Sequence, residues 1–496
     1  MLAKKSNVFS IIENILIAFI LLVVLISLAY LPPISLAEGL GYDGVWYHSP
    51  AVNLFSKIDN YHLFRIFPSA LVFCLRKAFG FDNSIQSTVF LFRWLNFGFL
   101  IGTLVFFKLI VAKLKFTGPI SILLLVFIFF NFNVCKEIVF NPVMTDNCTF
   151  FLSIGILYFY LGGHFIPLFC FLIVSIFTMP IVALFYPTFF LFYEMDSSDK
   201  QKIGWIKAIE NFFWIFPLFL AIGFMVISSV IVYYFKRITV YTFPAEIDLR
   251  FFPFILVINA AFIFYFILKF KLFFVQLLFK IQNIRSWIYS KWIISIVGLF
   301  IFQFIVSKIN NYHLLGYSGL LVGYPIILNL KPLIGLIDNL NFYGPVIFVF
   351  LIYFFFQLSS MEIRISDWFL MFFFFLIIIK PEARHTLFLL PLMSVFLCRF
   401  LSGFQISTRF LIVVLAIGAI FSKFWYPTHW AIFPPAYLIF SDATDPKIFQ
   451  QFPIQHYFMF QGPMMSTISY LIILCLELLC FWFIFKEFNK LKINSL

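Results

Sequence analysis

The chain is 496 residues long, with 63% hydrophobic and 11% charged residues. A soluble protein has about half apolar and a quarter charged residues, so this composition excludes a soluble globular domain and favours an integral membrane protein. The net charge of +13 comes from lysines and arginines that fall singly or in pairs between apolar runs. They form no continuous basic stripe, so no nucleic-acid partner is expected.

Apolar runs separated by charged or helix-breaking residues predict an all-α, polytopic transmembrane helical bundle of about 12–14 spans. No soluble segment interrupts the series, so residues 1–496 are predicted to form a single integral membrane domain. The candidate spans cover residues 11–31, 91–111, 119–133, 147–163, 165–178, 180–193, 211–235, 252–270, 292–309, 342–358, 367–380, 385–402, 409–424 and 466–485.

The orientation is predicted from the lysines beside the first span. Lys4 and Lys5 precede it, and lysines also follow the last span. Because positive residues favour the cytoplasmic side, both termini are expected in the cytoplasm. The polar loops 32–90, 236–251, 310–341 and 425–465 would then lie outside. We therefore expect any chemistry on the outer face of the membrane, and the composition is typical of a bacterial inner membrane protein.

The first external loop contains the segment GYDGVWYHSPAVN, residues 41–53. Asp43 lies between two glycines, which free the backbone to turn and leave the carboxylate unshielded by bulky neighbours. Trp46, Tyr47 and His48 offer the stacking faces and hydrogen-bonding groups that sugar rings use. The segment is therefore interpreted either as a substrate site with Asp43 as its acid, or as an ordinary loop turn with interfacial aromatic residues.

Residues 60–81 are apolar enough to contact lipid, but Arg65, Pro68, Arg76 and Lys77 interrupt them. We expect an amphipathic helix lying along the membrane interface, with its basic side chains reaching the headgroups. The alternative is an additional spanning helix, which would invert every later loop.

A second polar cluster is KPEARHTLFLLPL, residues 380–392, between two predicted spans. Lys380, Arg384 and His385 would lie at the outer membrane edge, where the phosphate of a lipid carrier would also lie. A guanidinium can bind such an anion through two hydrogen bonds. The alternative is a short charged loop in which Lys380 pairs with Glu382.

A third candidate is Asp146, at the start of a predicted span. An Asp in this position usually caps the helix, and here capping is favoured over catalysis, with substrate binding as a further role. No two histidines have the spacing of metal ligands. No cofactor is predicted, and the spacing gives a divalent metal no support. The sequence also lacks a phosphate-binding P-loop, so nucleotide-driven chemistry has no support.

The order of these features resembles the GT-C superfamily of integral membrane glycosyltransferases, which use polyprenyl-phosphate-linked sugars and include mannosyltransferase-like and aminoarabinose-transferase-like enzymes. GYDGVWYH resembles the acidic motif after the first span of that superfamily, with Asp43 at the acid. FPSALVFCLRKAFG resembles its interfacial helix, and Arg93 the arginine that opens the second span. Asp146 matches the acid of the second loop, and ARHTLFLLPL, with Arg384 and His385, resembles the late basic motif.

The resemblance implies how the chain is organised. Residues 1–165 would form a GT-C-like N-terminal module with interfacial helices in its first external loop, residues 32–90. Variable transmembrane helices would occupy residues 166–402. Residues 403–496 would form the C-terminal helices, with the external loop 425–465.

The resemblance also implies an enzyme, a hexosyl- or pentosyltransferase. It would move a sugar from a polyprenyl-phosphate donor to a hydroxyl of a lipid, glycan or protein acceptor on the outer face, with inversion. Asp43 would activate that hydroxyl as a general base. Arg384 and Lys380, with Arg93 or Arg65 as further candidates, would stabilise the departing phosphate.

Three other classes of protein remain as alternatives. A lipid or polysaccharide transporter or flippase would place ionisable groups within its spans, where Glu477 is the clearest example here. A surface-polysaccharide polymerase or ligase would need a late external loop rich in arginine. Residues 425–465 contain no arginine and only one lysine, Lys447. The third alternative is an assembly factor without activity.

Overall fold

The computed structural model describes residues 2–33, 36–54, 56, 58, 60–116, 118–196, 257, 260–261, 264, 291–309, 333–357, 364–378, 383–424 and 467–493. These residues are mostly helical, as the predicted all-α class requires. The predicted spans at 211–235 and 252–270, the loops at 236–251 and 425–465, and Lys380 lie outside the described residues, apart from four isolated positions between 257 and 264.

The described elements follow one another in this order: α1 (Leu2–Tyr30), η1 (Leu36–Gly39), α2 (Gly41–Val52), α3 (Asn60–Leu63), α4 (Phe67–Phe79), α5 (Ile85–Leu114), α6 (Gly118–Phe129), η2 (Asn133–Glu137), α7 (Ile138–Phe140), α8 (Asp146–Gly162), α9 (Phe165–Ile176), α10 (Pro180–Asp196), α15 (Lys291–Ile309), α17 (Ile334–Tyr343), α18 (Pro345–Gln357), α19 (Ile365–Ile378), η3 (Ala383–Leu389), α20 (Leu390–Leu401), β1 (Phe404–Gln405), α21 (Thr408–Ser422), α25 (Thr467–Phe488) and β2 (Lys492–Ile493).

Two described helices are long and apolar enough to cross a membrane, over Val8–Tyr30 and Ile85–Leu114. A third span is possible by length and composition if the bent pair Gly118–Phe129 and Asn133–Phe140 counts as one. Six further apolar helical stretches of the described part have 10–17 residues. The predicted membrane character is therefore confirmed at this coarser level, and the number of 12–14 spans stays a prediction.

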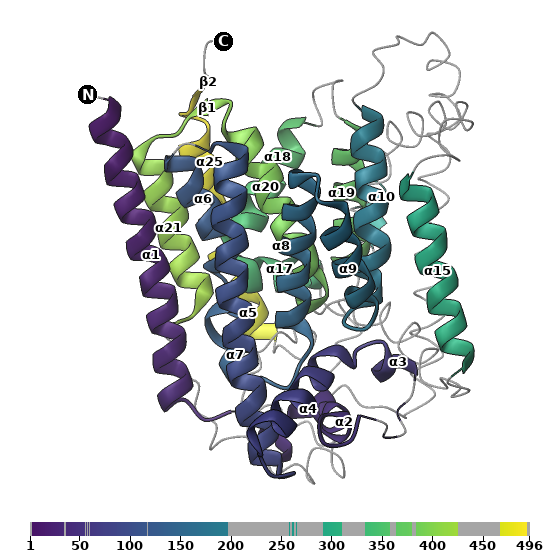
Figure 1. Ribbon diagram of the computed structural model, residues 1–496. Helices are drawn as coiled ribbons and strands as arrows, with labels where there is room; N and C mark the ends of the chain where they lie inside the picture. Colours follow the sequence, from purple (N-terminus) through teal and green to yellow (C-terminus); the bar gives the residue numbers. More distant parts are fainter. Residues whose placement is uncertain are drawn as a thin grey trace.

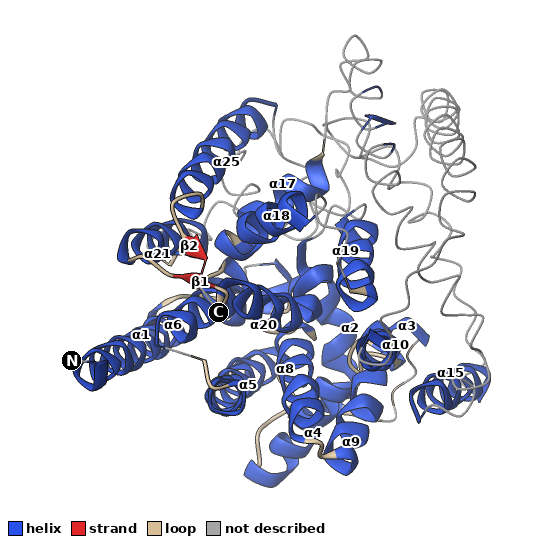
Figure 2. Cartoon of the chain, turned by 90° about the horizontal axis from the view of Figure 1, so that it is seen from above, coloured by secondary structure: helices blue, strands red, loops and turns tan. Residues whose placement is uncertain are grey.

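Both chain termini lie at one end of the helical assembly, and the short helices α2, α3 and α4 lie at the opposite end (Figure 1). Seen from above, α20 lies near the centre, with α5, α6 and α8 on one side of it and α18 on the other (Figure 2). The strands β1 and β2 pair antiparallel, with Phe404 opposite Ile493. This short ladder ties the end of the chain to the turn before α21.

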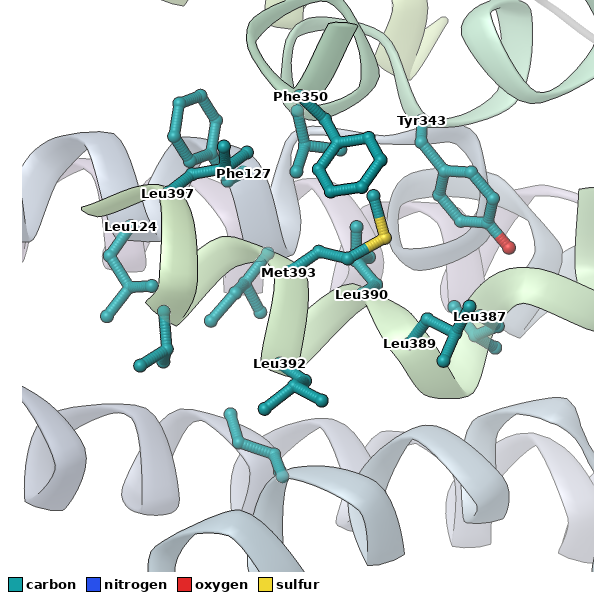
Figure 3. Packing of buried hydrophobic residues seen from close by; sticks show 14 of the residues in the cluster. Leu124, Phe127, Tyr343, Phe350, Leu387, Leu389, Leu390, Leu392, Met393 and Leu397 are labelled. Atoms are coloured by element: carbon teal, nitrogen blue, oxygen red, sulfur yellow. The ribbon is translucent and has the colours of Figure 1, made fainter. Parts of the chain in front are cut away.

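The core is a continuous cluster of apolar side chains between the long helices. Leu390, Met393 and Leu397 of α20 pack between α6 and α18, where Phe127 and Phe350 face them (Figure 3). These side chains are nearly or fully buried. Polar contacts also hold α1 against its neighbours, because its buried Glu13 accepts hydrogen bonds from Lys108 of α5 and Ser121 of α6.

Four local predictions differ from the structure. Residues 41–53 are mainly helical rather than a loop turn, and residues 60–81 form two helices, α3 and α4, rather than one. The helix α17 (Ile334–Tyr343) is largely buried, whereas residues 334–341 were predicted to belong to the external loop 310–341. Arg76, predicted to reach lipid headgroups, is instead 1% exposed, because it makes hydrogen bonds inside the protein.

Candidate functional site

A chain of polar contacts fastens α2 to α4 and α5. His48 Nδ1 of α2 lies 2.9 Å from the hydroxyl oxygen of Thr88 in α5. That oxygen also accepts a hydrogen bond from the buried guanidinium of Arg76, on α4. Arg76 donates a second hydrogen bond to the carbonyl of Asp82. The helix that carries Asp43 is therefore held firmly against the start of the second candidate span.

These contacts also decide the charge of His48. Burial lowers its pKa below the ordinary value, and the positive charge of Arg76 lowers it further. Burial lowers the pKa of Arg76 as well, while the carboxylate of Asp82 acts in the opposite direction. An arginine stays charged in spite of such a shift, so at neutral pH the pair consists of a neutral imidazole beside a guanidinium.

The three aromatic side chains that follow Asp43 do not share one face. Tyr47 is 1% exposed and packs edge-on against His62 of α3, with ring centroids 5.6 Å apart. Trp46 is 54% exposed and stacks on the same histidine at 5.2 Å. Because successive helix residues point about 100° apart, only Trp46 of the predicted stacking residues offers a large open ring. Tyr47 and His48 are engaged inside the protein.

The segment between α7 and α8 joins α2 to the rest of the site. Buried Asn96 of α5 positions this segment by donating a hydrogen bond of 2.8 Å to the carbonyl of Pro142. Gly44, next to Asp43, lies so close to Val143 that an added Cβ would be 3.0 Å from the Cβ of that valine. Met144 then contacts Arg384, whose Nη1 lies 3.9 Å from the Met144 sulfur.

Arg384 belongs to η3, which is held on two sides. Thr386 donates a hydrogen bond of 2.5 Å to Asn339 of α17. The phenol of Tyr186, on α10, donates one of 2.8 Å to the carbonyl of Phe388. Contacts with α8, α17, α19 and α20 surround the same short helix. The predicted late basic motif therefore lies on a fixed element beside the start of α8.

The structure thus brings together three of the predicted sites: α2 with Asp43, the first turn of α8 with Asp146, and η3 with Arg384. Asp146 is 6% exposed, and its place in the first turn of α8 suits a carboxylate. His385 follows Arg384 in η3.

Arg93 and Arg65 lie elsewhere. Arg93 Nη2 donates to the carbonyls of Ser27, Leu28 and Leu31, at 3.3, 3.0 and 2.7 Å, so it satisfies the C-terminal end of α1. Arg65 lies in the turn between α3 and α4, where its backbone N–H donates to the carbonyl of His62.

The structure adds buried polar residues that sequence reasoning did not select. Asp338, Asn339 and Asn341 of α17 are almost fully buried, as is Lys136 of η2. Asn339 is the partner of Thr386, so α17 forms part of the same site. The only signal in the sequence is the polar group Asp-Asn-Leu-Asn within an apolar stretch.

A further buried group lies where α17, α21 and α25 meet. Lys423 is 3% exposed and Glu477 2% exposed. Lys423 interacts electrostatically with both Asp338 and Glu477, and its ammonium lies 5.0 Å from the ring centroid of Phe132. Charged side chains are therefore more frequent in the interior than the apolar sequence indicated.

The described residues contain no group of three His, Cys, Asp or Glu side chains arranged to hold a metal ion. Comparison with known proteins identifies no relative: no family description, curated protein or solved structure matches the chain.

Proposed function

We propose that the chain is an integral membrane glycosyltransferase that moves a sugar from a polyprenyl-phosphate donor to an acceptor hydroxyl. The site would lie at the end of the bundle that carries α2 to α4, on the outer face of a bacterial inner membrane, with both termini in the cytoplasm. The observation that carries the proposal is the meeting of α2, the segment 143–146 and η3, through the contacts of Gly44 with Val143 and of Met144 with Arg384.

The chemistry needs a carboxylate acting as a base and a cation on opposite sides of the transferred sugar. Asp43 takes the proton of the acceptor hydroxyl while the oxygen attacks the anomeric carbon. The bond from that carbon to the phosphate oxygen breaks, and the lipid phosphate leaves as an anion on the opposite face, which inverts the configuration. Because a phosphate is a stable leaving group, it needs positive charge rather than a proton, and Arg384 can supply it.

The first prediction concerns Asp43. Asp43→Asn should lower the rate of transfer by at least about 100-fold, since positioned acid–base groups contribute about 10²–10⁴. The assay uses protein in detergent micelles, a radiolabelled polyprenyl-phosphate sugar, and a panel of lipid and glycan acceptors. Glu38→Gln is the matched control, because Glu38 is an exposed acid just before α2. Unreduced transfer by folded Asp43→Asn protein would remove the acid from the mechanism.

A transporter or flippase is the second candidate, favoured by the interior charges of Lys423, Asp338 and Glu477. Ionisable groups buried in a membrane protein commonly mark a transport pathway. An assay in detergent, where no second compartment exists, distinguishes the two candidate functions. An enzyme forms product there, and Glu477→Gln should leave that product formation intact. A transporter would show no product in detergent but a Glu477-dependent flux in sealed vesicles.

A further inference from the structure

The end of the bundle that holds both termini contains a cavity that the proposed reaction does not use. Its volume is about 310 Å³. It lies between the last turns of α8, α10 and α20, the end of α18 and the beginning of α19. α5 leads from the side of α4 towards this end (Figure 1), so the cavity is remote from α2.

The wall of this cavity is largely apolar and aromatic. Tyr160 and Phe190 stack face to face, with ring centroids 3.7 Å apart and planes 8° from parallel. Leu161 of α8 and Val395 and Phe400 of α20 continue the wall. A surface of this kind fits a hydrocarbon chain.

The charges of the cavity leave an excess of positive charge. Asp367 accepts a hydrogen bond from the phenol of Tyr353. Arg364 precedes Asp367 by three residues at the start of α19, a spacing at which opposite charges compensate each other. Arg399 donates a hydrogen bond of 3.0 Å to the phenol of Tyr193. Within the described part of the chain no carboxylate forms an ion pair with Arg399.

Arg399 also borders a second cavity, of about 490 Å³, which Lys115 lines together with Ser402 and Gln405. The guanidinium therefore lies between two cavities with a further cation nearby. A half-buried arginine with a neutral partner is well suited to an oxyanion, because its planar fork offers parallel N–H donors.

We propose that this cavity binds an anionic phospholipid. The phosphate of the headgroup is bound by Arg399, and an acyl chain lies along the wall formed by Tyr160 and Phe190. The site is independent of the proposed transfer reaction, because none of its residues belongs to α2, η3 or the segment 143–146.

The test measures lipid binding to the purified full-length protein. Dioleoyl phosphatidylglycerol, dioleoyl phosphatidylcholine and inorganic phosphate are titrated separately in neutral detergent, and the melting temperature is followed. We expect phosphatidylglycerol to stabilise the wild type at a concentration about tenfold lower than phosphatidylcholine, since two charge-assisted hydrogen bonds are at stake. Arg399→Gln should remove this difference. Arg399→Lys, which keeps the positive charge but lacks the planar guanidinium, should retain part of the difference between the two lipids.

Arg409→Gln is the matched control, because Arg409 is an exposed arginine in the first turn of α21, near β1. It should behave like the wild type. Native mass spectrometry of the lipid retained by folded protein provides a second readout that does not depend on melting. Equal lipid binding by Arg399→Gln and wild type, or equal binding of the two lipids, would overturn the proposal. Protection by inorganic phosphate at the same concentration would overturn the assignment to a lipid and indicate a free anion instead.

Discussion

Arg93 and Arg384 were both predicted to stabilise the departing phosphate, but they have different surroundings in the structure. Arg93 is committed to three carbonyls at the end of α1. Arg384 is half-buried on η3, beside Met144 and the start of α8. The structure therefore separates Arg93, which holds a helix end, from Arg384, which lies beside Met144 and the start of α8.

This difference gives a paired prediction. Arg384→Ala should lower kcat/KM for the lipid-linked donor by about 100-fold, as loss of one group that stabilises a developing anion does, with little change in melting temperature. Arg93→Ala should do the reverse, losing about 1.5–3 kcal/mol of stability from charged hydrogen bonds while the folded protein keeps its donor kinetics. The kcat/KM for the donor and the melting temperature are measured for both variants. An unchanged kcat/KM in Arg384→Ala would contradict the proposed role of Arg384.

His48 gives a prediction about pH. Its pKa is lowered in the folded protein, whereas the unfolded chain has the ordinary value of about 6.5. As the pH falls through that value the unfolded chain takes up a proton that the folded protein does not, so stability is present above it and is lost below it. The melting temperature of the wild type should therefore fall between pH 8 and pH 5.5.

His48→Gln should show a smaller fall over the same range, because the group that distinguishes the two states is gone. His164→Gln is the control, since His164 is exposed at the start of α9 and its loss should leave the fall unchanged. Parallel curves for His48→Gln and wild type would show that burial of His48 does not cause the pH dependence.

Among the elements, α2 is sensitive to the size of one residue, Gly44. Gly44 is helical and packs against Val143, whereas Gly98 of α5 has open space where a Cβ would be. Both are helical glycines, so replacement by alanine favours the helix by up to about 1 kcal/mol in each case. Only at Gly44 does the new methyl group meet a branched carbon that cannot move away easily.

We therefore expect Gly98→Ala to raise the melting temperature and Gly44→Ala to lower it. The added methyl should cost about 1–3 kcal/mol, as overpacking does. Transfer activity should fall as well, because α2 would move away from the segment 143–146. A stabilised and fully active Gly44→Ala protein would contradict the close packing.

The same elements indicate what can be predicted from the sequence. Apolar runs with clear ends gave nearly correct helices, as for α8 (predicted 147–163, observed Asp146–Gly162) and α21 (predicted 409–424, observed Thr408–Ser422). The helix α17 was not predicted, because its Asp and Asn residues lower the hydropathy of the sequence and a polar stretch is typical of a loop. α2 was interpreted as a turn because two glycines suggest one, although Gly44 provides close packing against Val143.

For the site, the sequence identified the segments but not their partners. Asp43, Asp146 and Arg384 were selected from their local sequence and then from motif order, and the structure places their elements side by side. Lys136, beside Glu137, and Asp338, beside Asn339, were not selected, because neither pair forms a motif with a known chemical role. Their contribution depends on contacts between residues far apart in the chain.

At the scale of the whole molecule, the positions of the termini and of α2 to α4 predict how the chain is oriented in the membrane. The termini lie at one end and α2 to α4 at the other (Figure 1). Lys77 of α4 and Lys490 after α25 are both exposed. In variants without other cysteines, Lys77→Cys in intact cells stripped of any outer membrane should react with an impermeant maleimide. Lys490→Cys should react only after the membrane is opened. The reverse pattern would place the proposed site in the cytoplasm.

One consequence concerns the depth at which substrates would meet the protein. α5 has 30 residues and α6 only 12, so at 1.5 Å per residue they measure about 45 Å and about 18 Å. α6 ends at Phe129, and the helical segment Asn133–Phe140 that follows, which contains Lys136, is bent by 66° from it. A helix of about 18 Å is too short to cross a hydrocarbon core of about 30 Å, so in a bilayer the break after α6 falls within the depth that α5 spans. Lys136 beside this break therefore has to be shielded from lipid by the protein, in agreement with its exposure of 4%.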